Sequence, residues 1–107
     1  MGYKTLLIDD KKVSGTTMPK ADKTARSLKA GVETLAEEKW ELLLLDFDLG
    51  EFGETGLNVL EFLKNNPQHR PQHIWLVSNF DEGTIKMSQY INEHMPEIRV
   101  ITRDRRY

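Results

Sequence analysis

Short apolar runs that end on acidic residues constrain the fold of this chain more than any other feature. Thr5 to Ile8 is followed by Asp9-Asp10, and Leu42 to Leu45 is followed by Asp46. Apolar runs this short and continuous are typical of parallel strands that are covered on both faces. Ile74 to Val77 is a third run of the same kind. We therefore predict three central strands of a parallel sheet, two of which end on carboxylates.

Amphipathic segments between the apolar runs predict helices. Thr55 is a suitable N-cap for the second helix, which Asn66-Pro67 ends. Asp81 is a suitable cap for the third helix, which continues to about Met95 and stops at Pro96. The apolar positions near helical spacing are Val32, Leu35, Ala36 and Trp40 in the first segment and Leu57, Val59, Leu60 and Leu63 in the second.

Two weaker strands complete the pattern. Thr24 to Leu28 is a short candidate, and Ile98 to Thr102 alternates in polarity as a half-exposed edge strand does. Strands that alternate with helices favour right-handed crossovers and an open α/β sheet. We predict a flavodoxin-like fold of about five parallel strands in the order 2-1-3-4-5. A chain of 107 residues has room for one core, so we predict a single domain over residues 1–107.

The first and last helices of such a fold are predicted to be reduced or absent. The stretch from Lys11 to Lys23 contains Gly15 and Pro19 with few apolar residues, so we expect a loop there. Only Arg103 to Tyr107 follow the last predicted strand. All three helices can then lie on one face of the sheet. Leaving the other face bare would cost several kcal/mol at about 25 cal/mol per Å² of apolar surface.

A bare apolar face predicts a partner. We expect a second copy of the chain, as a homodimer, or another protein to cover this face. The alternative is that Lys11 to Lys23 and the aromatic C-terminus fold back over it.

Composition excludes several classes of function. The net charge of -2 provides no strong field of either sign, so we expect no binding to nucleic acid or to an anionic membrane. The longest apolar run, Leu42 to Leu45, is far shorter than the ~20 residues that cross a bilayer. Cysteine is absent, which removes disulfides and thiolate chemistry. With no secretion signal in view, we expect a cytoplasmic protein.

The strand-terminal acids predict a metal site. Parallel strands end at one edge of a sheet, where ligands of open α/β folds bind, so we expect Asp9, Asp10 and Asp46 to converge. Their repulsion is answered by a raised pKa in a coupled set or, more simply, by a hard cation such as Mg²⁺, with one face open for phosphate. Asp48 is a further candidate that orients the Leu49 to Glu54 loop, with its backbone carbonyl toward the metal.

Other polar residues lie near the same edge or far from it. Ser78 follows the fourth strand, where its hydroxyl can donate to a phosphoryl oxygen, although a simple strand-end turn explains Ser78 equally well. Arg103 can reach the same rim as a cation, or belong to a basic terminus. The histidines are expected on the surface, away from the acids: His69, His73 and His94.

Three segments together resemble the receiver domains of two-component response regulators. They are Leu6 to Asp10, Leu44 to Gly50 and Leu76 to Asn79. The resemblance implies that Asp9 and Asp10 hold Mg²⁺, that Asp46 accepts a phosphoryl group from a phosphodonor, and that Ser78 contacts this group. Receivers carry a lysine after the fifth strand, whereas Ile101-Thr102-Arg103 stands here.

A closer resemblance is to the small cyclic-phosphate-processing receiver group. The matching positions are Asp9, Asp10, Asp46, Asp48, Leu49, Gly50, Thr55, Gly56, Ser78, Gly83 and Met87. Phe47 and Val77 occupy the places of that group's two histidines, and Lys11 or Lys12 stands in place of an arginine. Imidazoles are the natural acid and base for opening a cyclic phosphate, so their loss argues against that hydrolysis.

Three functions follow as hypotheses. The first is a receiver-like signalling or interaction module that binds Mg²⁺ and takes a phosphodonor or a small phosphate ligand, with Asp46 as a possible acceptor. The second is a phosphoesterase for cyclic phosphates that uses a metal-activated water. The third is a scaffold that acts through protein contacts alone.

Overall fold

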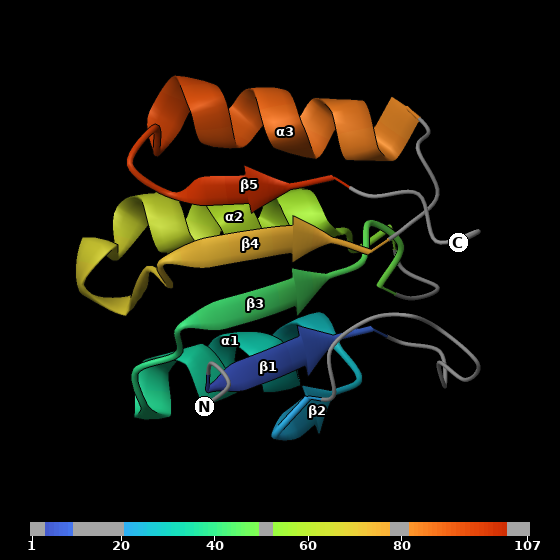
Figure 1. Ribbon diagram of the computed structural model, residues 1–107. Coiled ribbons are helices and arrows are strands. Elements are labelled where there is room, and N and C mark those ends of the chain that lie inside the picture. The colour runs from blue at the N-terminus through green and yellow to red at the C-terminus, as the bar shows by residue number, and fades with distance from the viewer. Residues whose placement is uncertain (1–3, 10–20, 50–52, 78–81, 103–107) are drawn as a thin grey trace.

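A computed structural model describes residues 4–9, 21–49, 53–77 and 82–102. Its five strands form one parallel sheet in the order β2-β1-β3-β4-β5 (Figure 1). The strands are β1 (Thr5–Ile8), β2 (Lys23–Ala25), β3 (Leu42–Leu45), β4 (His73–Leu76) and β5 (Arg99–Ile101). This arrangement confirms the predicted flavodoxin-like fold and its strand order.

The helices of the described residues are α1 (Leu28–Glu37), α2 (Gly56–Asn65) and α3 (Glu82–His94), with a short 3₁₀ turn η1 (Pro67–His69) after α2. The predicted cap of α2 is confirmed. The Thr55 hydroxyl accepts from the Leu57 N–H at 3.2 Å, and the Asn58 side chain accepts from the Thr55 N–H at 2.9 Å. The predicted Asp81 cap of α3 lies outside the described residues.

In the described parts of the chain, no helix has both the length and the apolar character needed to cross a membrane.

The first helix differs from its prediction. It begins after Ser27, whose hydroxyl accepts from the Ala30 N–H at 3.1 Å, and it ends before Trp40. Ala36 is exposed, whereas Gly31 is buried because α1 lies very close to β1. A Cβ atom on Gly31 would stand 2.7 Å from the end of the Ile8 side chain. The spacing of apolar residues identified Leu35 on this face but not Gly31 and Thr34, which are buried beside it.

Strand bounds also shift slightly. β2 covers Lys23 to Ala25 instead of Thr24 to Leu28, because Leu28 begins α1. Lys23 therefore belongs to a strand and not to the predicted loop, and residues 10–20 lie outside the described part of the chain.

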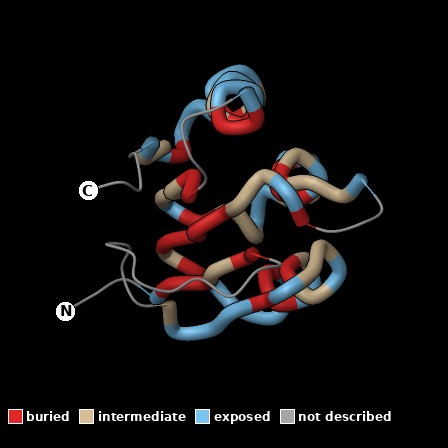
Figure 2. The backbone as a smooth tube through the Cα atoms, turned by 90° about the vertical axis from the view of Figure 1, so that its right-hand side faces the viewer, coloured by how far each residue is buried: buried red, intermediate tan, exposed pale blue. Residues whose placement is uncertain are grey.

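All the described helices lie on one face of the sheet (Figure 2). Alternate strand residues point toward them and form the main core. The strand side chains on this face are Leu6, Ile8, Leu43, Leu45, Ile74 and Leu76. They pack against Leu35 of α1, Leu60 of α2 and Ile91 of α3, each fully buried.

The opposite face carries a second apolar cluster. Leu42, Leu44 and Val77 are at most 4% exposed within the single chain, and Leu7 and Trp75 are partly buried beside them. The expectation of a bare face therefore does not hold for the middle of the sheet.

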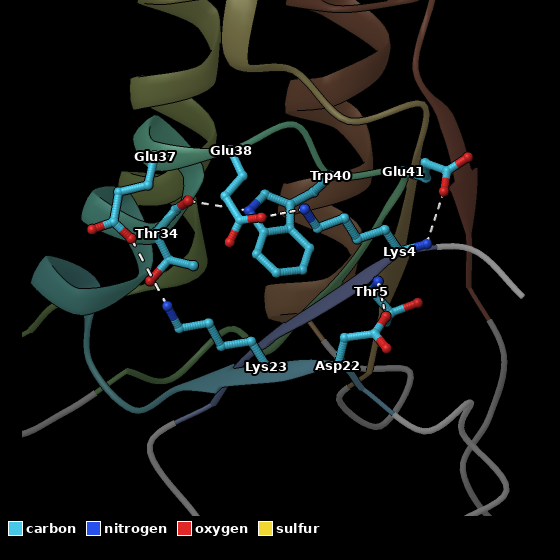
Figure 3. A network of polar contacts seen from close by, with 9 residues as sticks. All are labelled: Lys4, Thr5, Asp22, Lys23, Thr34, Glu37, Glu38, Trp40 and Glu41. Atoms are coloured by element: carbon cyan, nitrogen blue, oxygen red, sulfur yellow. Dashed lines mark hydrogen bonds and ion pairs between the residues drawn. The ribbon is translucent and has the colours of Figure 1, made fainter.

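A network of polar contacts fixes β1 beside β3 at the amino edge of the sheet (Figure 3). The Lys4 N–H donates to the Glu41 carboxylate at 2.9 Å, and the Lys4 carbonyl accepts from the N–H groups of Glu41 and Leu42 at 3.0 and 3.1 Å. The Lys4 ammonium pairs with Glu38 and lies 5.0 Å from the centre of the Trp40 ring. The start of β1 is thereby held in register against the start of β3.

The homodimer stays a prediction, and sedimentation checks it. Leu7 and Trp75 are only partly buried on the helix-free face. We expect a second copy to contact them, which gives a dimer at micromolar concentrations. Replacing Trp75 by Glu would place a charge in that interface and shift the protein toward monomer, whereas Gln89→Glu on the exposed side of α3 is the control. A parent protein that sediments as a monomer throughout this range rejects the dimer.

Candidate functional site

Asp9 and Asp46 lie next to each other at the carboxyl edge of the sheet. Ile8 pairs with Leu45, and the Asp46 N–H donates to the Ile8 carbonyl at 3.1 Å. The two aspartates follow directly on these paired residues, and neighbouring strands lie about 4.8 Å apart. The register therefore places Asp9 and Asp46 on neighbouring strand ends, and the meeting of their carboxylates stays a prediction.

The two carboxylates differ in environment. Asp9 is 2% exposed, and its N–H donates to the carbonyl of Ala25 at 3.0 Å, which extends the sheet toward β2. Asp46 is half-buried. Like charges on adjacent strand ends repel, and burial reduces the screening that water would provide.

The loop after β3 ties Asp46 to the start of α2. The Phe47 N–H donates to Oδ1 of Asp46 at 2.9 Å, and the Phe47 carbonyl accepts from the Gly56 N–H at 2.6 Å. Beyond it, Asp48 and Thr55 form an antiparallel bridge. The two ends of this loop, Phe47-Asp48 and Thr55-Gly56, are therefore joined next to Asp46 in the chain.

Two glycines allow both neighbouring helices to approach this loop. A Cβ atom on Gly56 would stand 2.6 Å from the Asp46 carbonyl oxygen and 2.5 Å from the Met87 sulfur. A Cβ atom on Gly83 would stand 2.5 Å from the ring of Phe47. Both glycines match a family pattern in the sequence, but no local signal indicates which distant side chain a glycine faces, so the sequence does not predict these contacts.

Several predicted site residues lie outside the described residues. They are Asp10, Ser78, Arg103, Gly50 and Asn79. Asp48 is described and exposed. Within the described ranges, no three histidine, cysteine or acidic side chains are grouped closely enough to hold a metal ion, so Asp9, Asp46 and Asp48 do not form such a group by themselves.

The histidines lie away from the acidic edge. His73 is the first residue of β4 and His94 the last of α3, while His69 ends η1. His69 stacks on Phe62 with ring centres 5.9 Å apart, and His94 lies 4.5 Å from the Tyr90 ring. These three are all the histidines of the chain, so no imidazole stands at the acidic edge.

The contact behind Asp46 predicts that Gly56→Ala destabilises the protein. The added methyl group overlaps a backbone oxygen, which cannot move aside as a flexible side chain does. We expect a loss of about 1–3 kcal/mol in the free energy of unfolding, measured with urea. Glu61→Ala, at an exposed position on the same helix, is the control and should change stability by less than about 0.5 kcal/mol. An unchanged urea midpoint for Gly56→Ala would contradict the tight contact.

Comparison with known proteins gives one match. The model of the cyclic-phosphate processing receiver domain family matches residues 4–93, which is most of the chain and contains Asp9, Asp46, Gly56 and Gly83. No significant match is found among curated proteins or among solved structures.

Proposed function

This chain belongs to the cyclic-phosphate processing receiver domain family, and on that premise we propose that it binds Mg²⁺ at the acidic edge and accepts a phosphoryl group on Asp46. The coarser function, a receiver-like signalling module, follows from the family itself. The observation that supports the finer proposal is the placement of Asp9 and Asp46 on paired strand ends, through the Ile8 to Leu45 register.

The donor set fits a hard cation. Carboxylate oxygens are the ligands that Mg²⁺ prefers, with waters filling the remaining positions. Asp9 and Asp46 would hold the ion, together with Asp10 and the backbone carbonyl of Asp48, as the sequence predicts. When bound, Mg²⁺ neutralises charge on the carboxylates and on an incoming phosphate.

Asp46 is the proposed nucleophile. One of its carboxylate oxygens forms a bond to the phosphorus of the donor while the bond from phosphorus to the leaving group breaks and the leaving group keeps the electron pair. The reaction needs a fixed carboxylate, and the Phe47 N–H holds Oδ1 at 2.9 Å. The N-terminus of α2 begins at Gly56, directly behind the Asp46 carbonyl, and a helix N-terminus favours negative charge nearby.

Ser78 is the proposed hydroxyl donor to the phosphoryl group. It follows Val77, whose N–H donates to the Leu45 carbonyl at 3.0 Å, so the chain enters position 78 from the strand next to Asp46. The contact between the Ser78 hydroxyl and the phosphoryl group is part of the proposal.

A second candidate function is hydrolysis of cyclic phosphates, which the description of the matched family favours. Water would then form the new bond to phosphorus in place of Asp46, while one ring P–O bond breaks and its oxygen leaves as a hydroxyl; a metal ion held by the carboxylates would supply the activation of that water. This function leaves no phosphate on the protein, so intact mass separates the two candidates.

Phosphorylation is tested with Mg²⁺ and acetyl phosphate, followed by intact-mass measurement. We expect the mass of one added phosphoryl group on the parent protein and none on Asp46→Asn, which lacks the nucleophilic carboxylate. Mg²⁺ at ten times its dissociation constant should also raise the free energy of unfolding by about 1.4 kcal/mol.

Asp22→Asn is the matched control. Asp22 accepts from the Thr5 N–H at 2.7 Å at the amino edge, so the same substitution there leaves the acidic edge intact. Product from a 2',3'-cyclic nucleotide without mass gain on the protein would favour the esterase. A protein that shows neither mass gain, nor cyclic-phosphate turnover, nor stabilisation by Mg²⁺ would leave only the scaffold hypothesis.

A further inference from the structure

We propose that Phe47 is a positioning residue for Asp46, and that the first turn of α3 supports Phe47 through Gly83. This inference rests on the proposed function of Asp46 and names the part of the fold that orients its carboxylate. Phe47 reaches the Asp46 carboxylate through its peptide N–H, so its proposed action is on the orientation of Asp46.

The peptide groups of Phe47 are held from both sides. Its N–H donates to Oδ1 of Asp46 at 2.9 Å, and its carbonyl accepts from the Gly56 N–H at 2.6 Å. The first bond restrains rotation of the Asp46 side chain. The second joins the same residue to the start of α2, so the donor of the first bond has a fixed position.

The ring of Phe47 is held by a third element. An ideal Cβ atom on Gly83 would stand 2.5, 2.8 and 2.9 Å from three ring carbons, which is closer than real Cβ atoms approach. Gly83 and its neighbour Thr84 are both buried, so the ring lies against a well-packed turn of α3. Only a glycine permits this contact.

The contact of Gly83 with the Phe47 ring and the bond from the Phe47 N–H to Oδ1 connect α3 to the Asp46 carboxylate. Any side chain at position 83 must displace either the ring or the helix. Rotation of the ring about χ1 would leave the Phe47 N–H in place, whereas a shift of the Phe47 backbone that relieves the overlap moves this N–H and alters the bond to Oδ1; the positioning role depends on the second response. A carboxylate that rotates freely must be ordered on binding, which weakens binding about 2- to 10-fold for one side chain.

The inference is tested with Gly83→Ala and Phe47→Ala. Alanine favours helix over glycine, so a loss of function in Gly83→Ala cannot be ascribed to a lower helix propensity of α3. The first measurement is the χ1 angle of Asp46, obtained from NMR couplings without metal. We expect one rotamer in the parent protein and averaging in both variants. Gln89→Ala, on the exposed side of α3, is the control and should leave χ1 unchanged.

The second measurement is the dissociation constant of Mg²⁺. We expect binding about 2- to 10-fold weaker in Gly83→Ala and in Phe47→Ala. The double variant should bind no more weakly than Phe47→Ala, because the added methyl group then has no ring to displace. Phe47→Leu supplies a more conservative variant if Phe47→Ala does not fold.

The outcomes separate the two proposals. An Asp46 side chain that keeps its single rotamer in Gly83→Ala overturns the positioning role, even if Mg²⁺ binds to the parent protein. If the Asp46 χ1 angle is averaged in Gly83→Ala but the parent protein does not bind Mg²⁺, the positioning role is supported and the metal site is overturned.

Discussion

The register between β1 and β3 is the constraint on which the rest of this structure depends. At the carboxyl edge, the Asp46 N–H donates to the Ile8 carbonyl at 3.1 Å, and at the amino edge the Lys4 carbonyl accepts from Glu41 and Leu42. A slip by one residue would turn every side chain of the strand to the other face. It would also separate Asp46 from Asp9, so the core and the acidic edge are fixed by the same hydrogen bonds.

The loop after β3 is where the sheet, α2 and α3 meet. The Phe47 N–H donates to Asp46 at the end of β3, and its carbonyl accepts from Gly56 at the start of α2. Its ring lies against Gly83 in the first turn of α3. Helices on one face of an open sheet usually leave the strand ends accessible to a ligand. Here both helices also begin within contact distance of the residue that follows Asp46. The acidic edge therefore includes the packing of α2 and α3 against Phe47 as well as the strand ends.

The description of the matched family and the residues of this chain point to different reactions. The matched family is named for cyclic-phosphate processing. In this chain, His69, His73 and His94 all lie away from the acidic edge, and the residue after Asp46 is a phenylalanine. An imidazole transfers protons near neutral pH, whereas a phenyl ring only packs. This difference is why phosphoryl acceptance by a carboxylate is the leading proposal.

The sequence by itself predicted the elements and the fold class, because continuous apolar runs and capping residues such as Thr55 are local signals. The strand order, and with it the neighbouring positions of Asp9 and Asp46, followed from the usual order of such folds. Apolar spacing placed Leu35 on the buried face of α1, but it did not show that Gly31 lies on the same face against Ile8. Nor did it show that Leu42, Leu44 and Val77 are buried within a single chain. Only the tertiary structure decided these points and the contact of Phe47 with Gly83, because a glycine carries no pattern that identifies its distant neighbour.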